Sequence, residues 1–411
     1  MKKDKINRRS FVTRFSLLGA VAGLVPQYAF SANERKSEEA AGIMKCKPYL
    51  QAVKKDAIRI RWITSEKCLS WVEYGENVQA LDKKAYCSID GLIQANNTIH
   101  DIPLKNLHPG RMYFYKVFSK KIEGFEPYKI TYGAIAESET YTFTTLNPGA
   151  ENTTFVVYND VHDRPETFAQ LFKFLTPGKR DFILLNGDIF SSLKTGEDQV
   201  IKNMLEPISE LFSTDVPFVF SRGNHEDRGQ YARQFPDYVS GGEQKFYFSF
   251  QSGPIYAVVL DSGEGTTDDN PLYGGILDFD AYRLEQKTWL EKEVQKPDFK
   301  KATYRVIINH IPPFYTASAD NHPSKFCREH WGPILNKAKI DLMLAGHTHI
   351  HGIHPAVLQK HNFPIVIGGG PRNGERTIIQ VNANKQALEV KMFSDTGKTI
   401  GELKIKNPKG K

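Results

Sequence analysis

Six short apolar runs after residue 150 constrain the fold of this chain more than any other feature of its sequence. They cover residues 155–158, 182–185, 218–220, 255–260, 306–308 and 342–344. Each has the length of a buried strand, and several intervals between them, such as residues 198–211 and 280–294, have helical periodicity. Strands that alternate with helices in this way predict a layered α/β domain.

Five of the six runs end in the same kinds of polar residue. Functional side chains of α/β sheets gather just beyond the carboxyl ends of the strands, so we expect these residues to converge in space. An isolated H-x-H sequence would more often be an ordinary surface loop, but five such strand ends in one chain favour a metal site. The residues are Asp160, His162, Asp188, Asn224, His225, His310, His347 and His349.

The chemistry of this set indicates two metal ions. It contains carboxylates, imidazoles and an amide but no thiolate, which suits Mn²⁺, Fe or Zn²⁺. There are too many groups for one tetrahedral ion, and a carboxylate can bridge two ions. Two metals about 3.5–4 Å apart bind phosphoryl oxygens and lower the pKa of a bound water, which suits in-line displacement at phosphorus.

The ordered motifs D-x-H, G-D, G-N-H-E, H and G-H-x-H resemble those of the calcineurin-like metallophosphoesterase superfamily, over residues 152–392. The resemblance implies a metallophosphoesterase fold of four layers, α/β/β/α. It implies that Asp188 bridges the metals and that His225, which is not a ligand, protonates the leaving oxygen or stabilises its charge. One metal would be held by Asp160, His162, Asp188 and His349, and the second by Asp188, Asn224, His310 and His347.

Other residues in the motifs have more than one interpretation. Glycines at positions 187, 223 and 346 suit close backbone approach or positive φ in tight turns at strand ends. Arg222 and Asn224 are candidates for binding substrate phosphate, and a structural ion pair is the alternative for Arg222. His351 falls outside the motifs and is expected on the surface or behind the ligands.

Residues 45–146 have a different pattern, with period two. Ile58, Ile60 and Trp62 alternate with arginines, and turn sequences separate the short runs. This pattern predicts an antiparallel β-sandwich of the fibronectin III type. The segment resembles the N-terminal domain of purple acid phosphatases in Trp62, in Tyr74-Gly75 and in the sequence L-x-P-G-x-x-Y-x-Y from Leu107.

The catalytic motifs depart from those of purple acid phosphatases at two positions. Those enzymes carry G-D-x-x-Y, in which the tyrosine binds ferric iron and gives the colour, whereas Ser191 stands at that position here. The first motif also supplies His162, which those enzymes lack. We therefore expect a colourless enzyme with two sites of the divalent type.

The first 31 residues resemble a signal peptide of the twin-arginine type. Arg8 and Arg9 precede an apolar stretch at residues 15–25, and Ala29-Phe30-Ser31 supplies small residues for cleavage. The apolar stretch is shorter than the ~20 residues that span a bilayer, and no later segment is long and apolar enough. The expected location of the mature protein is therefore the periplasm or the extracellular space, without a membrane span.

The net charge gives no support for a nucleic-acid partner. The formal charge is +7, but about +2 remains once the +5 of the first 31 residues is removed. The four cysteines, Cys46, Cys68, Cys87 and Cys327, lack C-x-x-C spacing, which leaves a possible disulfide between Cys68 and Cys87 and a reduced Cys327. Residues 393–411, rich in lysine at the end, are predicted to form a C-terminal tail.

The favoured function is hydrolysis of a small phosphate monoester, with water activated by the two metals. A phosphodiesterase of the same fold is the nearest alternative, and the walls of its pocket would be residues 262–274 and 312–331. A different class of function is an extracellular protein that binds a glycan or a protein and retains an inactive, metal-stabilised domain. Every expected ligand position is filled, which favours the enzyme; the oligomeric state is left open.

Overall fold

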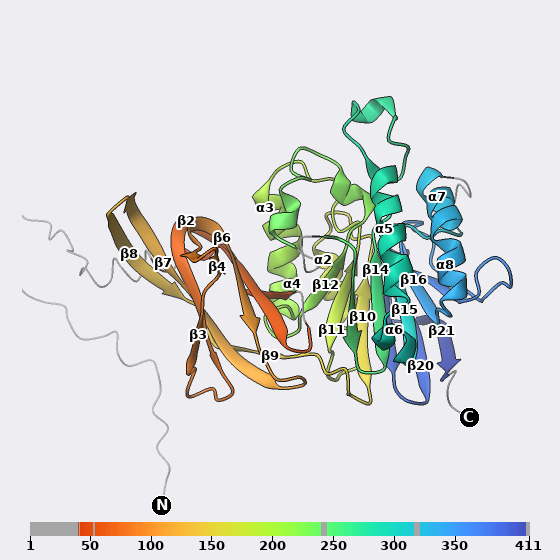
Figure 1. The fold of residues 1–411 in the computed structure, drawn as a ribbon, viewed down its shortest axis with the longest axis horizontal. Coiled ribbons are helices and arrows are strands. Elements are labelled where there is room, and N and C mark those ends of the chain that lie inside the picture. Colours follow the sequence, from red (N-terminus) through yellow and green to blue (C-terminus); the bar gives the residue numbers. More distant parts are fainter. Residues whose placement is uncertain (1–39, 41, 52–53, 240–244, 316–320, 408–411) are drawn as a thin grey trace, which may run out of the picture.

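The computed structural model describes residues 40, 42–51, 54–239, 245–315 and 321–407. The predicted signal peptide at residues 1–31 lies outside the described residues. Figure 1 shows two parts, an N-terminal β-structure and a larger layered body of sheets and helices. No helix in the described ranges has the length and hydropathy needed to cross a membrane.

The N-terminal part is the predicted β-sandwich. Its longest strand, β2, serves both halves: residues 57–63 pair with β6, and residues 68–75 pair with β7. Ile58, Ile60 and Trp62 are fully buried, as the alternation predicted. The strands are β1 (Tyr49–Gln51), β2 (Ala57–Gly75), β3 (Lys83–Ala85), β4 (Ser88–Ile89), β5 (Leu92–Ile93), β6 (Ala95–Lys105), β7 (Met112–Glu126), β8 (Lys129–Glu137) and β9 (Tyr141–Thr144).

Two sheets form the centre of the second part. In the first, the parallel strands β10, β11 and β12 continue into the antiparallel strands β19, β20 and β21. Its members are β10 (Thr153–Tyr158), β11 (Phe182–Asn186), β12 (Phe218–Ser221), β19 (Thr377–Ala383), β20 (Ala387–Ser394) and β21 (Thr399–Lys406). The second sheet comprises β13 (Phe248–Ser252), β14 (Ile255–Leu260), β15 (Tyr304–Asn309), β16 (Leu342–Ala345), β17 (Gly352–His354) and β18 (Ile365–Ile367).

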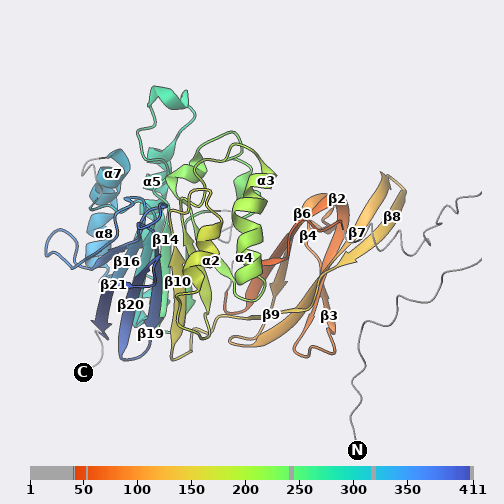
Figure 2. The same ribbon diagram turned by 180° about the vertical axis from the view of Figure 1, so that it is seen from behind.

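Helices cover the outer face of each sheet (Figure 1 and Figure 2). The first sheet packs against α2 (Glu166–Phe172), α3 (Glu197–Val200), the π-helical segment η1 (Ile201–Leu205) and α4 (Glu206–Leu211). The second packs against α5 (Phe279–Glu293), α6 (Pro297–Lys301), α7 (His322–His330) and α8 (Gly332–Lys337). The short 3₁₀ turns are η2 (Asn224–Asp227), η3 (Phe235–Asp237) and η4 (Pro271–Tyr273).

A continuous apolar core lies between the two sheets. Phe155, Leu184 and Val219 from the first sheet belong to the same buried cluster as Val259 and Ile308 from the second. Strands that are covered on both faces need apolar side chains at every position, which explains their unbroken apolar runs. The structure confirms the predicted four-layer α/β/β/α arrangement.

The two parts share one sheet. Strand β1 pairs antiparallel with β2 of the sandwich and, at Gln51, parallel with Phe218 of β12. The Tyr115 hydroxyl donates to the Thr214 carbonyl at 2.7 Å across the same boundary. Backbone pairing therefore joins the sandwich to the layered body, a connection that the sequence did not predict.

The C-terminal residues differ from the predicted tail. Thr399–Lys406 form the edge strand β21, which pairs with β20 from Ala387 onward. Leu403 and Ile405 pack against the core between the sheets, while Lys404 is exposed and pairs with Glu389 at 2.6 Å. The lysines that suggested a tail are the solvent side of an edge strand, where lysine discourages further pairing.

All four cysteines are free. Cys327 is buried, as expected, and its pKa is raised by burial to about 12. The disulfide that sequence spacing allowed between Cys68 and Cys87 is not formed.

Candidate metal centre

The predicted ligands converge on one site beyond the strand ends. Asp160 follows β10, Asp188 follows β11, Asn224 follows β12, His310 follows β15 and His347 follows β16. The first three come from one sheet and the last two from the other, so the site lies where the two sheets meet. The carboxylate and imidazole donor atoms fall into two groups, each within 4.8 Å, and Asp188 belongs to both.

The first group is formed by Asp160, His162, Asp188 and His349. Nε2 of His162 lies 3.8 Å from Oδ1 of Asp160 and 3.7 Å from Oδ2 of Asp188. Nε2 of His349 lies 3.3 Å from Oδ1 of Asp160 and 3.1 Å from Nε2 of His162. Two carboxylates and two imidazole nitrogens thus face a common point, as the donors around a cation do.

The second group is formed by Asp188, His310 and His347, with Asn224 beside it. Nδ1 of His347 lies 2.9 Å from the amide oxygen of Asn224. Nδ1 of His310 donates to the Asn186 carbonyl at 2.7 Å, so Nε2 is the ring nitrogen that faces the donor group. That Nε2 lies 3.1 Å from Oδ2 of Asp188 but makes no hydrogen bond.

The buried charges of this arrangement favour a cation between its donors. Burial lowers the pKa of His310, yet the Asp188 and Asp160 carboxylates raise it to about 10. Burial opposes the charge of both carboxylates, and the surrounding histidines nevertheless lower their pKa values. A metal cation satisfies all of these groups together, and the orphaned Nε2 of His310 fits a ligand position.

The ligand loops hold an unusual backbone conformation. Asp160, His162, Asp188, His347 and His349 all have φ between 49° and 69°. Residues other than glycine avoid this left-handed region, and such strain gathers at functional sites where surrounding structure enforces it. Asp and His enter this region more often than most residues other than glycine, but nothing in the sequence marks these five positions for it.

The three predicted glycines are needed for close approach. A Cβ on Gly187 would come within 2.5 Å of Nδ1 of His310, and one on Gly346 within 2.5 Å of Oδ2 of Asp160. A Cβ on Gly223 would overlap Oδ1 of Asp188. Only Gly187 of the three has a positive φ, at 78°, so the other two positions exclude a side chain for lack of space.

Glu226 holds the Asp188 loop and was missed as a functional residue. Its carboxylate accepts backbone N–H groups from Asp188, Ile189, Phe190 and Gly223 at 2.8–3.1 Å. Burial and the Asp188 charge raise the pKa of Glu226 to about 8. The backbone N–H donors act in the opposite direction, because they favour the charged carboxylate. The G-N-H-E motif contained this residue, but only its contacts reveal that it orients the shared carboxylate.

His225 lies beside the ligands and belongs to neither donor group. Its Nδ1 donates to the Ser191 carbonyl at 2.6 Å, so Nε2 is the acceptor, 3.9 Å from Oδ2 of Asp188. Burial lowers the pKa of His225. Ser191 thus contributes a backbone carbonyl where purple acid phosphatases place a tyrosine ligand.

Arg222 takes the structural alternative that the sequence left open. Its Nη1 lies 2.9 Å from Asp227, and Nε and Nη2 both contact Asp261, at 2.9 and 2.6 Å. The guanidinium also stacks over Phe246. With these donors occupied, the prediction that Arg222 binds substrate phosphate is replaced by a role in tying β12 to the loop after β14.

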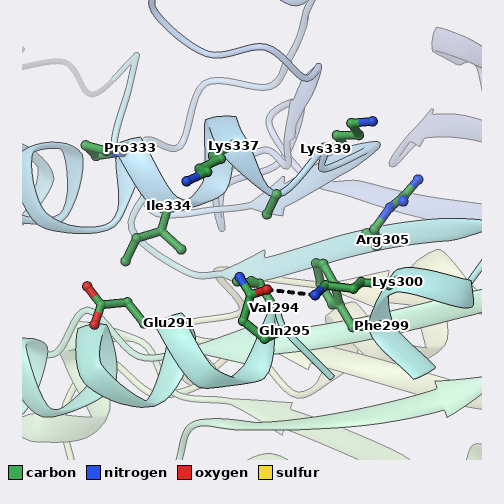
Figure 3. A pocket seen from close by; sticks show the side chains of 11 residues that line it. Glu291, Val294, Gln295, Phe299, Lys300, Arg305, Pro333, Ile334, Lys337 and Lys339 are labelled. Atoms are coloured by element: carbon green, nitrogen blue, oxygen red, sulfur yellow. Dashed lines mark hydrogen bonds between the residues drawn. The ribbon is translucent and has the colours of Figure 1, made fainter. Parts of the chain in front are cut away.

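The histidines outside the motifs do not join the donor groups. His351 is exposed, and His322 bonds Asp280 at 2.8 Å. A separate pocket of about 810 Å³ lies between α5, α6 and α8, with Glu291 of α5 opposite Ile334 of α8 (Figure 3). It contains none of the candidate ligands, so the chemistry is located at the strand ends and not in this pocket.

Substitution of Gly223 by alanine tests the close packing around Asp188. The added methyl group would displace the shared carboxylate, and we expect metal affinity to fall about 10–100-fold, as for other changes behind metal ligands. Metal titration followed by calorimetry measures this effect. Gly332→Ala is the matched control, because its Cβ would meet nothing within 4 Å. Equal affinity in Gly223→Ala and wild type would contradict the packing argument.

The domain comparisons divide the chain at the boundary between its two parts. Residues 153–351 match the calcineurin-like phosphoesterase family. Residues 46–145 match the N-terminal domain of purple acid phosphatases. The first match covers all the candidate ligands, and the second covers the β-sandwich.

Known proteins agree with these matches. Purple acid phosphatase 21 of Arabidopsis thaliana is 23% identical over 374 residues, 85% of this chain and 76% of the relative. A probable glycerophosphodiester phosphodiesterase of Arcobacter nitrofigilis is 29% identical over 177 residues, 42% of this chain and 57% of the relative. The purple acid phosphatase PPD1 from yellow lupin seeds has the same fold, with a TM-score of 0.66 at 16% identity, covering 87% of this chain and 74% of that one. The chain therefore belongs to the calcineurin-like metallophosphoesterases, metal-dependent phosphoester hydrolases, and carries a purple acid phosphatase-like N-terminal domain.

Proposed function

We propose that this chain hydrolyses phosphate monoesters at a centre of two metal ions. The observation that carries the proposal is the Asp188 carboxylate, which belongs to both donor groups and can bridge the ions. In this assignment Asp160, His162 and His349 complete one site, and Asn224, His310 and His347 complete the other. Bound metals would supply a water of lowered pKa and a clamp on the phosphoryl oxygens.

The protein groups around Asp188 fix the direction of its two oxygens. Oδ1 accepts the backbone N–H of His225 at 3.0 Å, and Oδ2 faces His310 and His162. The carboxylate cannot rotate without losing that hydrogen bond. A pre-set bridge keeps the ligands in position before substrate arrives, which lowers the reorganisation needed during the reaction.

His225 is proposed to act on the leaving oxygen. Its Nδ1–H bond to the Ser191 carbonyl holds the ring, and it leaves Nε2 as the atom that can hold or receive a proton beside the centre. The ring centroid lies 4.6 Å from that of His162, so the acting atom is close to the proposed ligands. This geometry supports a positioned general acid or a group that stabilises developing charge.

The ligand chemistry supports divalent Mn, Fe or Zn ions and not a tyrosinate-bound ferric site. Ser191 supplies no phenol at the family's tyrosine position, and its carbonyl is engaged by His225. Imidazole and carboxylate ligands suit these borderline ions.

A phosphodiesterase is the second candidate. The relative from Arcobacter nitrofigilis, a probable glycerophosphodiester phosphodiesterase, supports this candidate, and its match covers 42% of this chain. Purple acid phosphatase 21 spans 85% of the chain, including the sandwich, and this broader match favours the monoesterase. The metal-stabilised binding protein is disfavoured, because all seven proposed ligand positions are filled and six of these residues supply donor atoms to the two groups around Asp188.

We also propose that the protein is exported folded through its twin-arginine sequence. Replacing Arg8 and Arg9 by lysine should leave uncleaved protein in the cytoplasm, since the arginine pair is the distinguishing element of such signals. Cell fractionation with immunoblotting measures the distribution. Arg14→Lys, outside the pair, is the control. Unchanged export of the double variant would refute this route.

Asp188→Asn tests the two-metal proposal. The neutral amide cannot bridge two cations, so we expect bound metal and turnover of an aryl phosphate to be lost together, with turnover at least about a hundredfold lower. Elemental analysis and a phosphate-release assay measure both quantities. Wild-type protein should lack a visible absorption band while containing metal. Full metal content in Asp188→Asn, or none in wild type, would contradict the proposal.

His225→Ala separates catalysis from metal binding. Loss of the imidazole should lower turnover about a hundredfold, within the range for general acid–base groups, with metal content unchanged. The loss should be smaller for an aryl phosphate whose leaving group is strongly acidic, because that group needs little protonation. The proposed role fails if turnover is unaffected with a poorly acidic leaving group.

A further inference from the structure

Arg228 reaches the proposed catalytic histidine from a fixed position. Its Nε and Nη2 donate to the two oxygens of Glu264 at 2.8 and 2.6 Å, and its Nη1 donates to Nε2 of His225 at 2.9 Å. The Arg228 side chain is 31% exposed, while the Glu264 side chain is fully buried. A buried carboxylate thus holds a partly exposed guanidinium beside the metal centre in the paired geometry that arginine favours.

The residues behind Glu264 keep it from moving. The backbone N–H of Gly265 donates to Oε1 of Glu264 at 2.6 Å. The fully buried Arg283 donates to the carbonyls of Ser262 and Glu264, both at 2.8 Å. Residues 262–265, the first part of the pocket wall expected at residues 262–274, therefore form a rigid support for Arg228.

A comparison with Arg222 shows that Arg228, unlike Arg222, has a guanidinium N–H group that can turn to a phosphate oxygen. Arg222 is 17% exposed, and its charge lies between two carboxylates, Asp227 and Asp261. Arg228 forms an ion pair with one carboxylate, Glu264, and also interacts with the Tyr273 hydroxyl. Its Nη1 contacts His225, a neutral acceptor that a phosphate oxygen can outcompete. A phosphate oxygen carries charge and forms a stronger hydrogen bond with guanidinium than imidazole does.

Gly265 leaves room beside both Arg228 and a proposed metal ligand. A Cβ on Gly265 would lie 3.6 Å from the amide nitrogen of Asn224 and 3.9 Å from Nη2 of Arg228. The missing side chain keeps this position open between the guanidinium and the second donor group. A phosphoryl oxygen directed toward Asn224 would therefore come within reach of Arg228.

We propose that Arg228 binds a terminal oxygen of the substrate phosphoryl group and makes the centre selective for monoesters over diesters. This inference rests on the proposed phosphatase function. A monoester has three terminal oxygens, so two can face the metal pair while the third faces Arg228. In a diester the second ester group replaces that third oxygen and removes one negative charge. When Nη1 turns to phosphate, Nε2 of His225 is released to face the leaving oxygen.

The test compares Arg228→Gln with wild type on an aryl phosphate and a bis-aryl phosphate. A lost charge-assisted hydrogen bond should raise KM for the aryl phosphate about 30-fold. For the bis-aryl phosphate the change should stay within about threefold, since that contact is absent. Arg228→Lys, which keeps the charge, should recover part of the loss. Arg233→Gln, at an exposed arginine of the same segment, is the control and should match wild type.

Inorganic phosphate binding gives a readout that does not depend on turnover. Calorimetry on the metal-loaded protein should show about 30-fold weaker phosphate binding in Arg228→Gln. The double variant Arg228→Gln/Glu264→Gln removes both charges, so that no buried carboxylate is left unpaired, and should behave like the single variant. Unchanged metal content and thermal unfolding in the variants would show that the effect is local.

Two results would overturn the inference. Equal losses on both esters would make Arg228 a structural residue, and unchanged KM with unchanged phosphate affinity would remove it from the site. Failure of the proposed function looks different, because wild-type protein would then fail to hydrolyse the aryl phosphate at any metal loading. Phosphate affinity of wild type and Arg228→Gln would decide the binding role of Arg228 even in that case.

Discussion

The carboxylate of Asp188 is buried at the meeting point of the two sheets, with imidazole nitrogens of His162 and His310 facing the same oxygen. A second carboxylate, Asp160, lies in the same donor group. Burying two negative charges without a compensating positive charge costs free energy. The histidines reduce that cost, and the metal cations that we assign here would remove it. The buried charge of Asp188 therefore determines that the surrounding loops must supply imidazole groups and metal ligands.

The backbone around this carboxylate adopts conformations that position the proposed ligands at a local cost in stability. Five of the proposed ligands adopt left-handed φ values, and three glycines provide space that a methyl group would fill. Glu226 compensates by accepting four backbone N–H groups from the turns at Asp188 and Gly223. Strain of this kind persists because two sheets with fully buried strands hold the loop ends in place.

Around the ligands, arginines that are paired with carboxylates hold the neighbouring strand ends and loops in position. Arg222 ties the strand end of β12 to Asp261 after β14, and Arg283 supports the loop that carries Glu264. Arg228, held by Glu264, is the member that reaches the centre. The sandwich is joined to the same sheet through β1, so the catalytic half and the N-terminal half form one hydrogen-bonded framework.

The sequence by itself determined the layered α/β body, the sandwich and the set of residues at the strand ends. These features follow from local periodicity and from the rule that ligands lie just after buried strands, both of which are readable along the chain. Only the tertiary structure decided which arginine is bound between carboxylates and which faces His225. It also decided that residues 399–406 close a sheet and that Glu226 orients Asp188. These outcomes depend on partners such as Asp261 and Glu264, which are more than thirty residues away and follow no local period.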